Sequence, residues 1–185
     1  MRALPEFGGV ALHLAHPGAG LSRLGGGPPY WAYVWAGGAA LAAHVMADPA
    51  LVRGRRVLDF GAGSGLAGLV AARLGASVAV AEADPWARAA LALNAEANGQ
   101  RLRFWRGGRV DVVLAGDVFY APEVAQSVLP VLRGLAERGA RVLVGDPGRR
   151  DLPLQHLTLL ARHPVRDMGD PPGALRDGLV FALKP

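Results

Sequence analysis

VLDFGAGSGL, residues 57–66, decides the fold of this chain. Its apolar start is typical of a buried strand, and Gly61, Gly63 and Gly65 then form a turn that no side chain obstructs. The segment after the turn predicts an amphipathic helix. The next apolar run, residues 77–80, leads to Glu82, 21 residues after Gly61. In open α/β sheets this spacing is typical of a nucleoside-binding site. The glycines let the backbone approach the nucleoside, and the acid after the second strand binds the ribose hydroxyls.

Asp59, two residues before the first glycine, distinguishes two classes of nucleoside cofactor. Residues 63–68 match the GxGxxG pattern, so the spacing alone permits a nicotinamide dinucleotide. The pyrophosphate of such a cofactor favours amides and a helix dipole, and a neighbouring carboxylate would repel it. S-adenosylmethionine has no phosphate and carries an ammonium and a sulfonium. We therefore expect S-adenosylmethionine to bind at Asp59, the three glycines and Glu82.

Composition indicates one globular domain. The chain has 185 residues, of which 51% are hydrophobic and 19% charged. Residues 1–36 are expected to cover the cofactor site, and residues 37–185 to form a Rossmann-like core. The absence of cysteine excludes disulfides and thiolate metal sites, and the five histidines lack metal-ligand spacing, so no metal is expected. The opening residues do not resemble a signal peptide and no apolar run is long enough for a membrane span, which predicts a cytoplasmic protein.

The net charge of +5 is carried almost entirely by arginine, since lysine occurs once, at Lys184. One group of arginines surrounds two aromatic residues and is the best local candidate for nucleic-acid binding; it comprises Arg101, Arg103, Arg106 and Arg109 around Phe104 and Trp105. A preference for arginine together with abundant glycine and alanine is more typical of genome composition, so nucleic acid is not the expected partner. Attraction to an acidic protein surface fits the charge equally well.

Strand and helix signals alternate after the glycine turn. Helices are expected over residues 39–47, 64–74 (with Ser64 as N-cap and Gly75 just past its end), 85–99, from Pro122 with a kink at Pro130, and 154–161. Strands are expected over residues 10–14, from Val57, over 78–82, 101–105, 110–115 and 142–144, near Val165, and over 179–183. This order predicts an α/β fold, a mainly parallel, Rossmann-like seven-stranded sheet with helices on both faces. Ligands of such sheets bind at the carboxyl ends of the strands.

Four blocks carry a resemblance to a known family: PYWA (29–32) with WAGG (35–38), VLDFGAGSG (57–65), GDVFY (116–120) and GDPGR (145–149). With them the chain resembles the seven-β-strand (class I) methyltransferases. Within that group it is similar to the protein-lysine methyltransferases that modify the β subunit of electron transfer flavoprotein. The resemblance covers roughly residues 10–150. It implies S-adenosylmethionine as methyl donor, and as acceptor a lysine of that β subunit or of another protein.

The same resemblance implies roles for several side chains. Asp117 follows the fourth strand of the core and is expected to grip and aim the acceptor ammonium, with Tyr120 narrowing the channel and Asp146 completing the catalytic group. Trp35 is expected to form a wall of the cofactor site. Residues 100–109 contain no Asp or Asn for the adenine amino group, so adenine is expected to stack on Trp105.

Other functions remain open at this point. A small-molecule N-methyltransferase acting on a nicotinamide-like amine would need a deep closed pocket, whereas a protein substrate would need an open groove. A nicotinamide-dependent oxidoreductase and a non-catalytic adenosine-binding module are the further alternatives. The sequence does not identify the acceptor, the number of methyl groups added or the oligomeric state.

Overall fold

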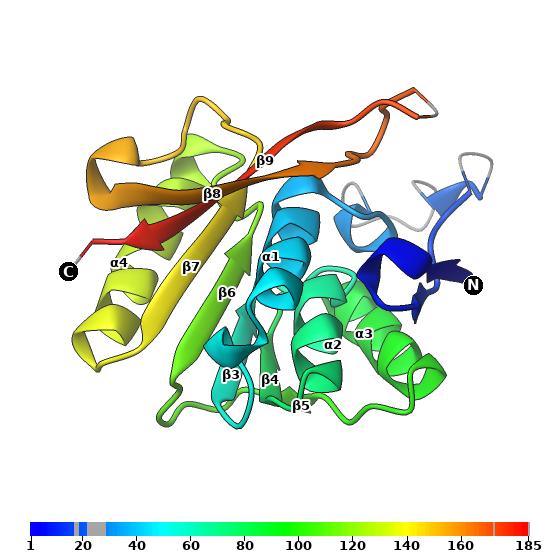
Figure 1. The fold of residues 1–185 in the computed structure, drawn as a ribbon, viewed down its shortest axis with the longest axis horizontal. Coiled ribbons are helices and arrows are strands. Elements are labelled where there is room, and N and C mark those ends of the chain that lie inside the picture. The colour runs from blue at the N-terminus through cyan, green and yellow to red at the C-terminus, as the bar shows by residue number, and fades with distance from the viewer. Residues whose placement is uncertain (17–18, 22–28, 172, 185) are drawn as a thin grey trace.

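A seven-stranded sheet, in the order β5-β4-β3-β6-β7-β9-β8, forms the centre of the computed structural model, which describes residues 1–16, 19–21, 29–171 and 173–184 (Figure 1). The strands are β3 (Arg56–Phe60), β4 (Ser77–Ala81), β5 (Arg103–Phe104), β6 (Val112–Gly116), β7 (Arg141–Asp146), β8 (Leu157–Val165) and β9 (Arg176–Leu183). Strands β3 to β7 are parallel, and β9 lies antiparallel between β7 and β8. The predicted mainly parallel seven-stranded sheet is confirmed.

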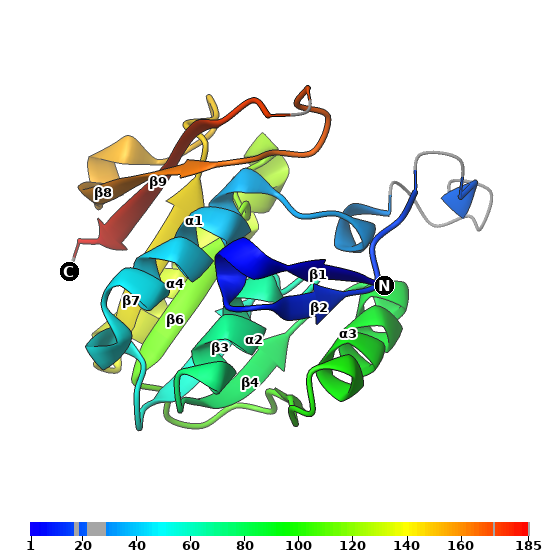
Figure 2. The ribbon, with the colours of Figure 1, turned by 45° about the vertical axis from the view of Figure 1, so that its right-hand side comes forward.

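Helices cover both faces of this sheet, as predicted. They are α1 (Ala36–Ala47), α2 (Leu66–Arg73), α3 (Pro85–Ala97) and α4 (Pro122–Glu137). One apolar core joins α1, α2 and α3 to alternate strand residues such as Val57 and Leu114, and a second joins α4 to the residues between them, such as Leu58 and Val113. Because successive strand residues face opposite sides, each continuous apolar strand feeds both cores. Figure 2 shows α1 and α2 in front of the sheet with α4 behind it.

The N-terminal residues form a separate antiparallel hairpin of β1 (Arg2–Leu4) and β2 (Val10–Leu12), joined by the short 3-10 turn Pro5–Phe7. Asn94 of α3 and Asn98, which follows its last residue, bind β2 and the residue after it. The Asn98 side chain accepts a hydrogen bond from the Ala11 N–H and donates one to the Ala11 carbonyl, while Asn94 accepts one from the His13 N–H. The strand predicted over residues 10–14 is therefore present and ends at Leu12.

Two local predictions are wrong. Residues 154–161 do not form a helix: a 3-10 turn, Leu154–His156, leads directly into β8, which pairs with β9. The backbone hydrogen-bond partners of β8 lie in β9, which follows it in the chain. This pairing outweighs the helical preference of residues 154–161. Ser64 is not the N-cap of α2, because the glycine turn extends one residue further and Gly65, at φ 81°, takes that position.

Other boundaries agree with the sequence within a few residues. Gly75 lies just past the end of α2 with φ 94°, and the Asp84 carboxylate caps α3 by accepting a hydrogen bond from the Trp86 N–H at 2.8 Å. Helix α1 begins at Ala36, three residues before its predicted start, and α4 continues past Pro130 to Glu137. The predicted kink at Pro130 stays a prediction.

Candidate active site

The carboxyl ends of β3, β4, β6 and β7 meet at one edge of the sheet and bring the predicted site residues together (Figure 1). The glycine turn follows β3, Glu82 follows β4, Asp117 follows β6, and Asp146 ends β7. The first turn of α1 closes against the ends of β6 and β7: a Cβ atom on Gly37 would overlap the Gly145 carbonyl. This topology is why acids far apart in sequence become neighbours.

Glu82 braces the glycine turn. One of its oxygens accepts a hydrogen bond from the Gly63 N–H at 2.9 Å, and the other accepts from the N–H groups of Ala83 and Asp84 at 2.8 and 3.0 Å. Gly63 has φ 52°, in the left-handed region that L side chains rarely adopt. Glu82 thus fixes the turn that was predicted to receive the nucleoside. Its contact with ribose, and those of Gly61, Gly63 and Gly65 with the cofactor, stay predictions.

Asp59 lies beneath the first turn of α2 and is only 3% exposed. Its carboxylate accepts a hydrogen bond from the Gly68 N–H at 2.9 Å. Burial raises the pKa of Asp59 to about 7, against the lowering effect of that hydrogen bond, and the negative charge of Glu82 adds to the rise. The one side-chain contact described for Asp59 is therefore with backbone, and its predicted contact with the cofactor stays a prediction.

Asp117 and Asp146 are joined by Arg149, a residue whose role the sequence did not reveal. The guanidinium donates to Asp117 at 2.6 Å and to Asp146 at 3.0 Å, so that one cation serves two carboxylates. Asp146 is fully buried, and its other oxygen accepts from the N–H groups of Gly148 and Arg149, both at 2.7 Å. The signal was present, since Arg149 ends the GDPGR block, but its partners depend on β6 and β7 being neighbours.

Asp117 is held by contacts from β7, α1 and Arg149. It has φ 58°, an uncommon conformation outside glycine, and its N–H donates to the Gly145 carbonyl. The second carboxylate oxygen accepts from the Gly38 N–H in the first turn of α1 at 2.8 Å. Burial raises the pKa of Asp117, while the charge and hydrogen bond of Arg149 and the amides of α1 lower it. Its side chain retains 12% exposure, which leaves it open towards solvent on one side.

Aromatic side chains line this edge beside the acids. Tyr120, about half exposed, lies 5.7 Å from Tyr30 between ring centroids, and Tyr30 lies 5.8 Å from Trp35. The Trp35 indole N–H donates to the Tyr30 carbonyl at 2.7 Å, and Tyr33 makes an edge contact with Trp35. The sequence singled out Tyr120 and Trp35 but gave no site role to Tyr30 and Tyr33. Their proximity arises because the 3-10 turn Tyr30–Ala32 lies across the sheet edge.

That turn also reaches the glycines. A Cβ atom on Gly63 would lie 4.0 Å from the Cα of Trp31, so the N-terminal segment passes directly over the glycine turn. This contact agrees with the expectation that residues 1–36 cover the cofactor site. The division into a covering segment and a core stays a prediction.

Trp105 follows β5, and its backbone N–H donates a hydrogen bond to the Val80 carbonyl at 2.8 Å. The ring is partly buried against the second apolar core. The indole nitrogen is buried and has no hydrogen-bond partner within the described residues. Stacking of adenine on Trp105 stays a prediction.

Carboxylates and aromatic faces both attract cations, so this edge is suited to cationic ligands. Among the described residues no group of three His, Cys, Asp or Glu side chains could hold a metal ion. In the same part of the chain, no helix has both the length and the apolar character needed to cross a membrane.

Comparison with known proteins places these features in a family context. Residues 44–125 match the family model described as ribosomal protein L11 methyltransferase (PrmA). The electron transfer flavoprotein β-subunit lysine methyltransferase of Xenopus laevis is 36% identical over 174 residues, covering 86% of this chain and 71% of the frog protein. The protein of that name from Mus musculus is 39% identical over 131 residues, covering 65% of this chain and 51% of its own length.

Solved structures share the fold at low identity. A putative RNA methyltransferase from Pyrococcus horikoshii superimposes with a TM-score of 0.58 at 20% identity, covering 89% of this chain and 95% of that protein. Magnesium protoporphyrin IX methyltransferase from Synechocystis, solved with bound S-adenosylmethionine, has a TM-score of 0.55 at 17% identity, covering 77% of this chain and 76% of its own.

Proposed function

The chain belongs to the family of electron transfer flavoprotein β-subunit lysine methyltransferases, and we propose that it transfers a methyl group from S-adenosylmethionine to the side-chain amine of a protein lysine. The 36% identity to the frog relative, over 71% of that protein's length, carries the proposal. A sheet edge lined with acids and aromatic rings supports it, because donor and acceptor are both cationic. When bound, S-adenosylmethionine supplies a methyl group on a positively charged sulfur.

We propose that the donor is held along the ends of β3 and β4. The glycine turn admits the backbone to close contact, and Glu82 both braces that turn and accepts from the ribose hydroxyls. Trp35 forms one wall and Trp105 stacks on adenine, with its unpartnered indole N–H as a further donor. Asp59 acts from beneath by fixing the start of α2.

The acceptor is proposed to bind at Asp117. The two carboxylates Asp117 and Asp146 share the single positive charge of Arg149, so one negative charge remains for an incoming ammonium. Removing the proton of a lysine with pKa ~10.4 near pH 7.4 costs roughly 4 kcal/mol, and a neighbouring carboxylate raises that cost. Asp117 therefore grips and aims the ammonium without acting as its base. The ammonium must first lose a proton to solvent, which the positive charge of the sulfonium would favour. Tyr120 would then narrow the approach and orient the nitrogen lone pair towards the methyl group, so that the new N–C bond forms as the C–S bond breaks and S-adenosylhomocysteine is left.

Exposed aromatic rings beside the acids favour a protein acceptor over a small amine. Tyr30 and Tyr120, which flank the acids, are each about half exposed, as an open groove requires. The β subunit of electron transfer flavoprotein is the proposed substrate, since the relatives are named for it. A cytoplasmic location is proposed with it.

The test uses the enzyme, isotopically labelled donor and protein extract of the host, with the purified host β subunit assayed in parallel. We expect label in the β subunit, located to a lysine by mass spectrometry. Asp117→Asn keeps size and hydrogen bonding but loses the charge, so it should lower methyl incorporation far more than donor affinity measured by calorimetry. Labelling of a small amine but of no protein would contradict the proposal, as would binding of donor without any methylated product.

A further inference from the structure

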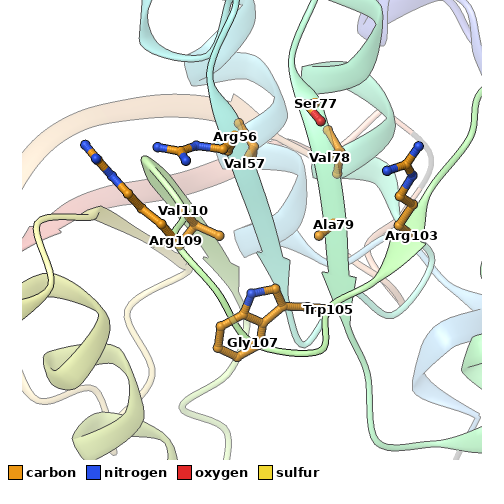
Figure 3. Close-up of a pocket in the computed structure, with 10 residues that line it drawn as sticks. All are labelled: Arg56, Val57, Ser77, Val78, Ala79, Arg103, Trp105, Gly107, Arg109 and Val110. Atoms are coloured by element: carbon orange, nitrogen blue, oxygen red, sulfur yellow. The ribbon is translucent and has the colours of Figure 1, made fainter.

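A hollow lies on the part of the sheet that the helices leave uncovered. The crossovers after β3, β4 and β6 carry α2, α3 and α4, whereas the β5–β6 crossover, residues 105–111, contains no helix and is described throughout. Its short loop leaves a gap against the first residues of β3 and β4 (Figure 3). The lining includes Val57, Val78, Ala79 and Val110 as apolar floor, with Trp105 at one end.

The charged residues that line this hollow are all basic. Arg56, Arg103 and Arg109 line it and no lining residue is acidic; Figure 3 shows Arg103 and Arg109 on opposite sides. Arg56 is paired with Asp111 just outside, at 2.6 Å, and Arg109 is 4.0 Å from the same carboxylate. Arg101, Arg103 and Arg106 are exposed and make no ion pair or side-chain hydrogen bond in the described part of the chain.

The aromatic residues here leave no pair of free ring faces for nucleic-acid bases. The Arg88 guanidinium lies 4.3 Å from the centroid of the Phe104 ring and covers one of its faces. Trp105 packs against the second apolar core and is already proposed to stack on the adenine of the donor. Nucleic-acid surfaces that tolerate many sequences need free aromatic faces beside a basic groove. This surface instead offers guanidinium groups, which are hydrogen-bond donors that match carboxylates.

We propose that this hollow docks an acidic segment of the protein whose lysine is methylated. The inference rests on the proposed function and adds a second recognition surface to it. The hollow lies at the starts of β3 and β4, whereas Asp117 lies at the carboxyl edge, and four residue steps of strand span about 13 Å. A folded substrate reaches both places at once, and a short peptide around the lysine reaches only the catalytic edge.

Direct binding is tested with a fluorescein-labelled peptide of ten glutamates, using fluorescence anisotropy at low salt. Wild-type enzyme should bind it, and Arg103→Glu/Arg109→Glu should weaken binding by at least about tenfold, because like charges then face each other. The matched control is Arg133→Glu/Arg138→Glu, which makes the same change of net charge at two exposed residues at and just beyond the end of α4. This control should bind like wild type.

Kinetics with the methylated protein supply the second readout. Arg103→Glu/Arg109→Glu should raise KM for the folded protein about tenfold or more while leaving donor affinity and KM for a short lysine peptide unchanged. If wild-type enzyme does not bind the acidic peptide, the docking proposal is overturned, even if the protein is methylated. Equal loss in the mutant and the control, loss of donor affinity, or tighter binding of a single-stranded RNA oligonucleotide than of the acidic peptide would also overturn it. Absence of any methylated protein with intact peptide binding would instead overturn the proposed function.

Discussion

Arg149 determines the charge of the sheet edge at which the acceptor is proposed to bind. It lies between two carboxylates, both far less exposed than an ordinary surface acid, and Asp117 also faces the N–H groups at the start of α1. Without the guanidinium, its charge and its hydrogen bond would no longer oppose the effect of burial, and the pKa of Asp117 would rise further. The arginine therefore favours the ionised form of Asp117, which is the form that attracts a cation.

We expect Arg149→Gln to move the acid limb of the pH profile of kcat/KM for the acceptor to higher pH. The reason is that Asp117 attracts an ammonium only when ionised, and its folded pKa rises when the cation is removed. Arg149→Lys should restore most of the wild-type profile, and donor affinity measured by calorimetry should change little. A variant that loses activity equally at all pH values would show that Arg149 is only structural.

Asp59 makes stability depend on pH in the opposite sense from an acid whose pKa is lowered by folding. Its folded pKa is about 7, above the ordinary value of 3.8, so the folded protein binds the extra proton between these values. Stability from this group is complete below pH 3.8 and is lost as pH rises towards and through 7. Between pH 5 and pH 8 wild type should lose roughly 3 kcal/mol of stability relative to Asp59→Asn, because about two pH units of that range lie below the folded pKa of about 7 and each contributes ~1.4 kcal/mol. Denaturant unfolding of both proteins measures the difference, and parallel pH curves would contradict the assignment.

The contact of α1 with β7 fixes how close the helix comes to Asp117 and Asp146. A Cβ atom on Gly37 would overlap the Gly145 carbonyl, whereas the nearest atom to a Cβ on Gly38 is an Asp117 oxygen at 4.0 Å. Gly37→Ala should therefore lower the free energy of unfolding by about 1–3 kcal/mol or more. Gly38→Ala, its neighbour in the same helix, should stay within about 1 kcal/mol of wild type. Thermal or denaturant unfolding distinguishes the two, and equal stabilities would show that α1 can shift away from the sheet.

Glu82 stabilises the glycine turn through its hydrogen bonds, whether or not it also contacts ribose. Glu82→Ala should weaken donor binding roughly ten- to hundredfold, since a charged acceptor contributes on the order of 1.5–3 kcal/mol. Asp84→Ala is the control: it removes the α3 cap at a cost of about 1 kcal/mol of stability and leaves the turn intact. Calorimetry with S-adenosylmethionine measures both. An unchanged dissociation constant for Glu82→Ala would make this residue a strand-end acid without a binding role.

Elements defined by neighbouring residues were predictable from the sequence, and elements defined by distant partners were not. The glycine turn, the cap at Asp84 and the parallel strands follow from local signals. The first half of β8 was predicted as part of a helix over residues 154–161, whereas its end near Val165 was predicted as a strand. The error arose because the hydrogen-bond partners of β8 lie in β9, beyond a connecting loop. Arg149 was quoted in a motif without a role for a similar reason, since Asp117 reaches it only once β6 and β7 pair.

At the scale of the whole molecule, the N-terminal hairpin and the glycine turn share one buried residue. Asn94 is fully buried; it accepts from the His13 N–H at 2.7 Å and donates to the Ser64 carbonyl at 2.8 Å. A single side chain thus ties the segment after β2 to the turn proposed to hold the donor. Because Trp31, further along the same chain, also approaches Gly63, we expect ligand binding at the glycine turn to be coupled to the hydrogen bonds that hold β2.

Donor binding should therefore slow hydrogen exchange in β2 as well as in the glycine turn, although β2 is not a proposed contact of the donor. Asn94→Ala leaves the His13 N–H and the Ser64 carbonyl without partners, so we expect about 1–3 kcal/mol lower stability, weaker donor binding and loss of the protection in β2. Asn98→Ala releases only Ala11 and the Asn94 carbonyl, so β2 should exchange faster while donor affinity is retained. Hydrogen-exchange mass spectrometry with and without S-adenosylhomocysteine measures both effects. If saturating ligand protects the glycine turn of the wild-type protein and leaves β2 unchanged, the two segments bind and fold independently, and Asn94 is only a packing residue.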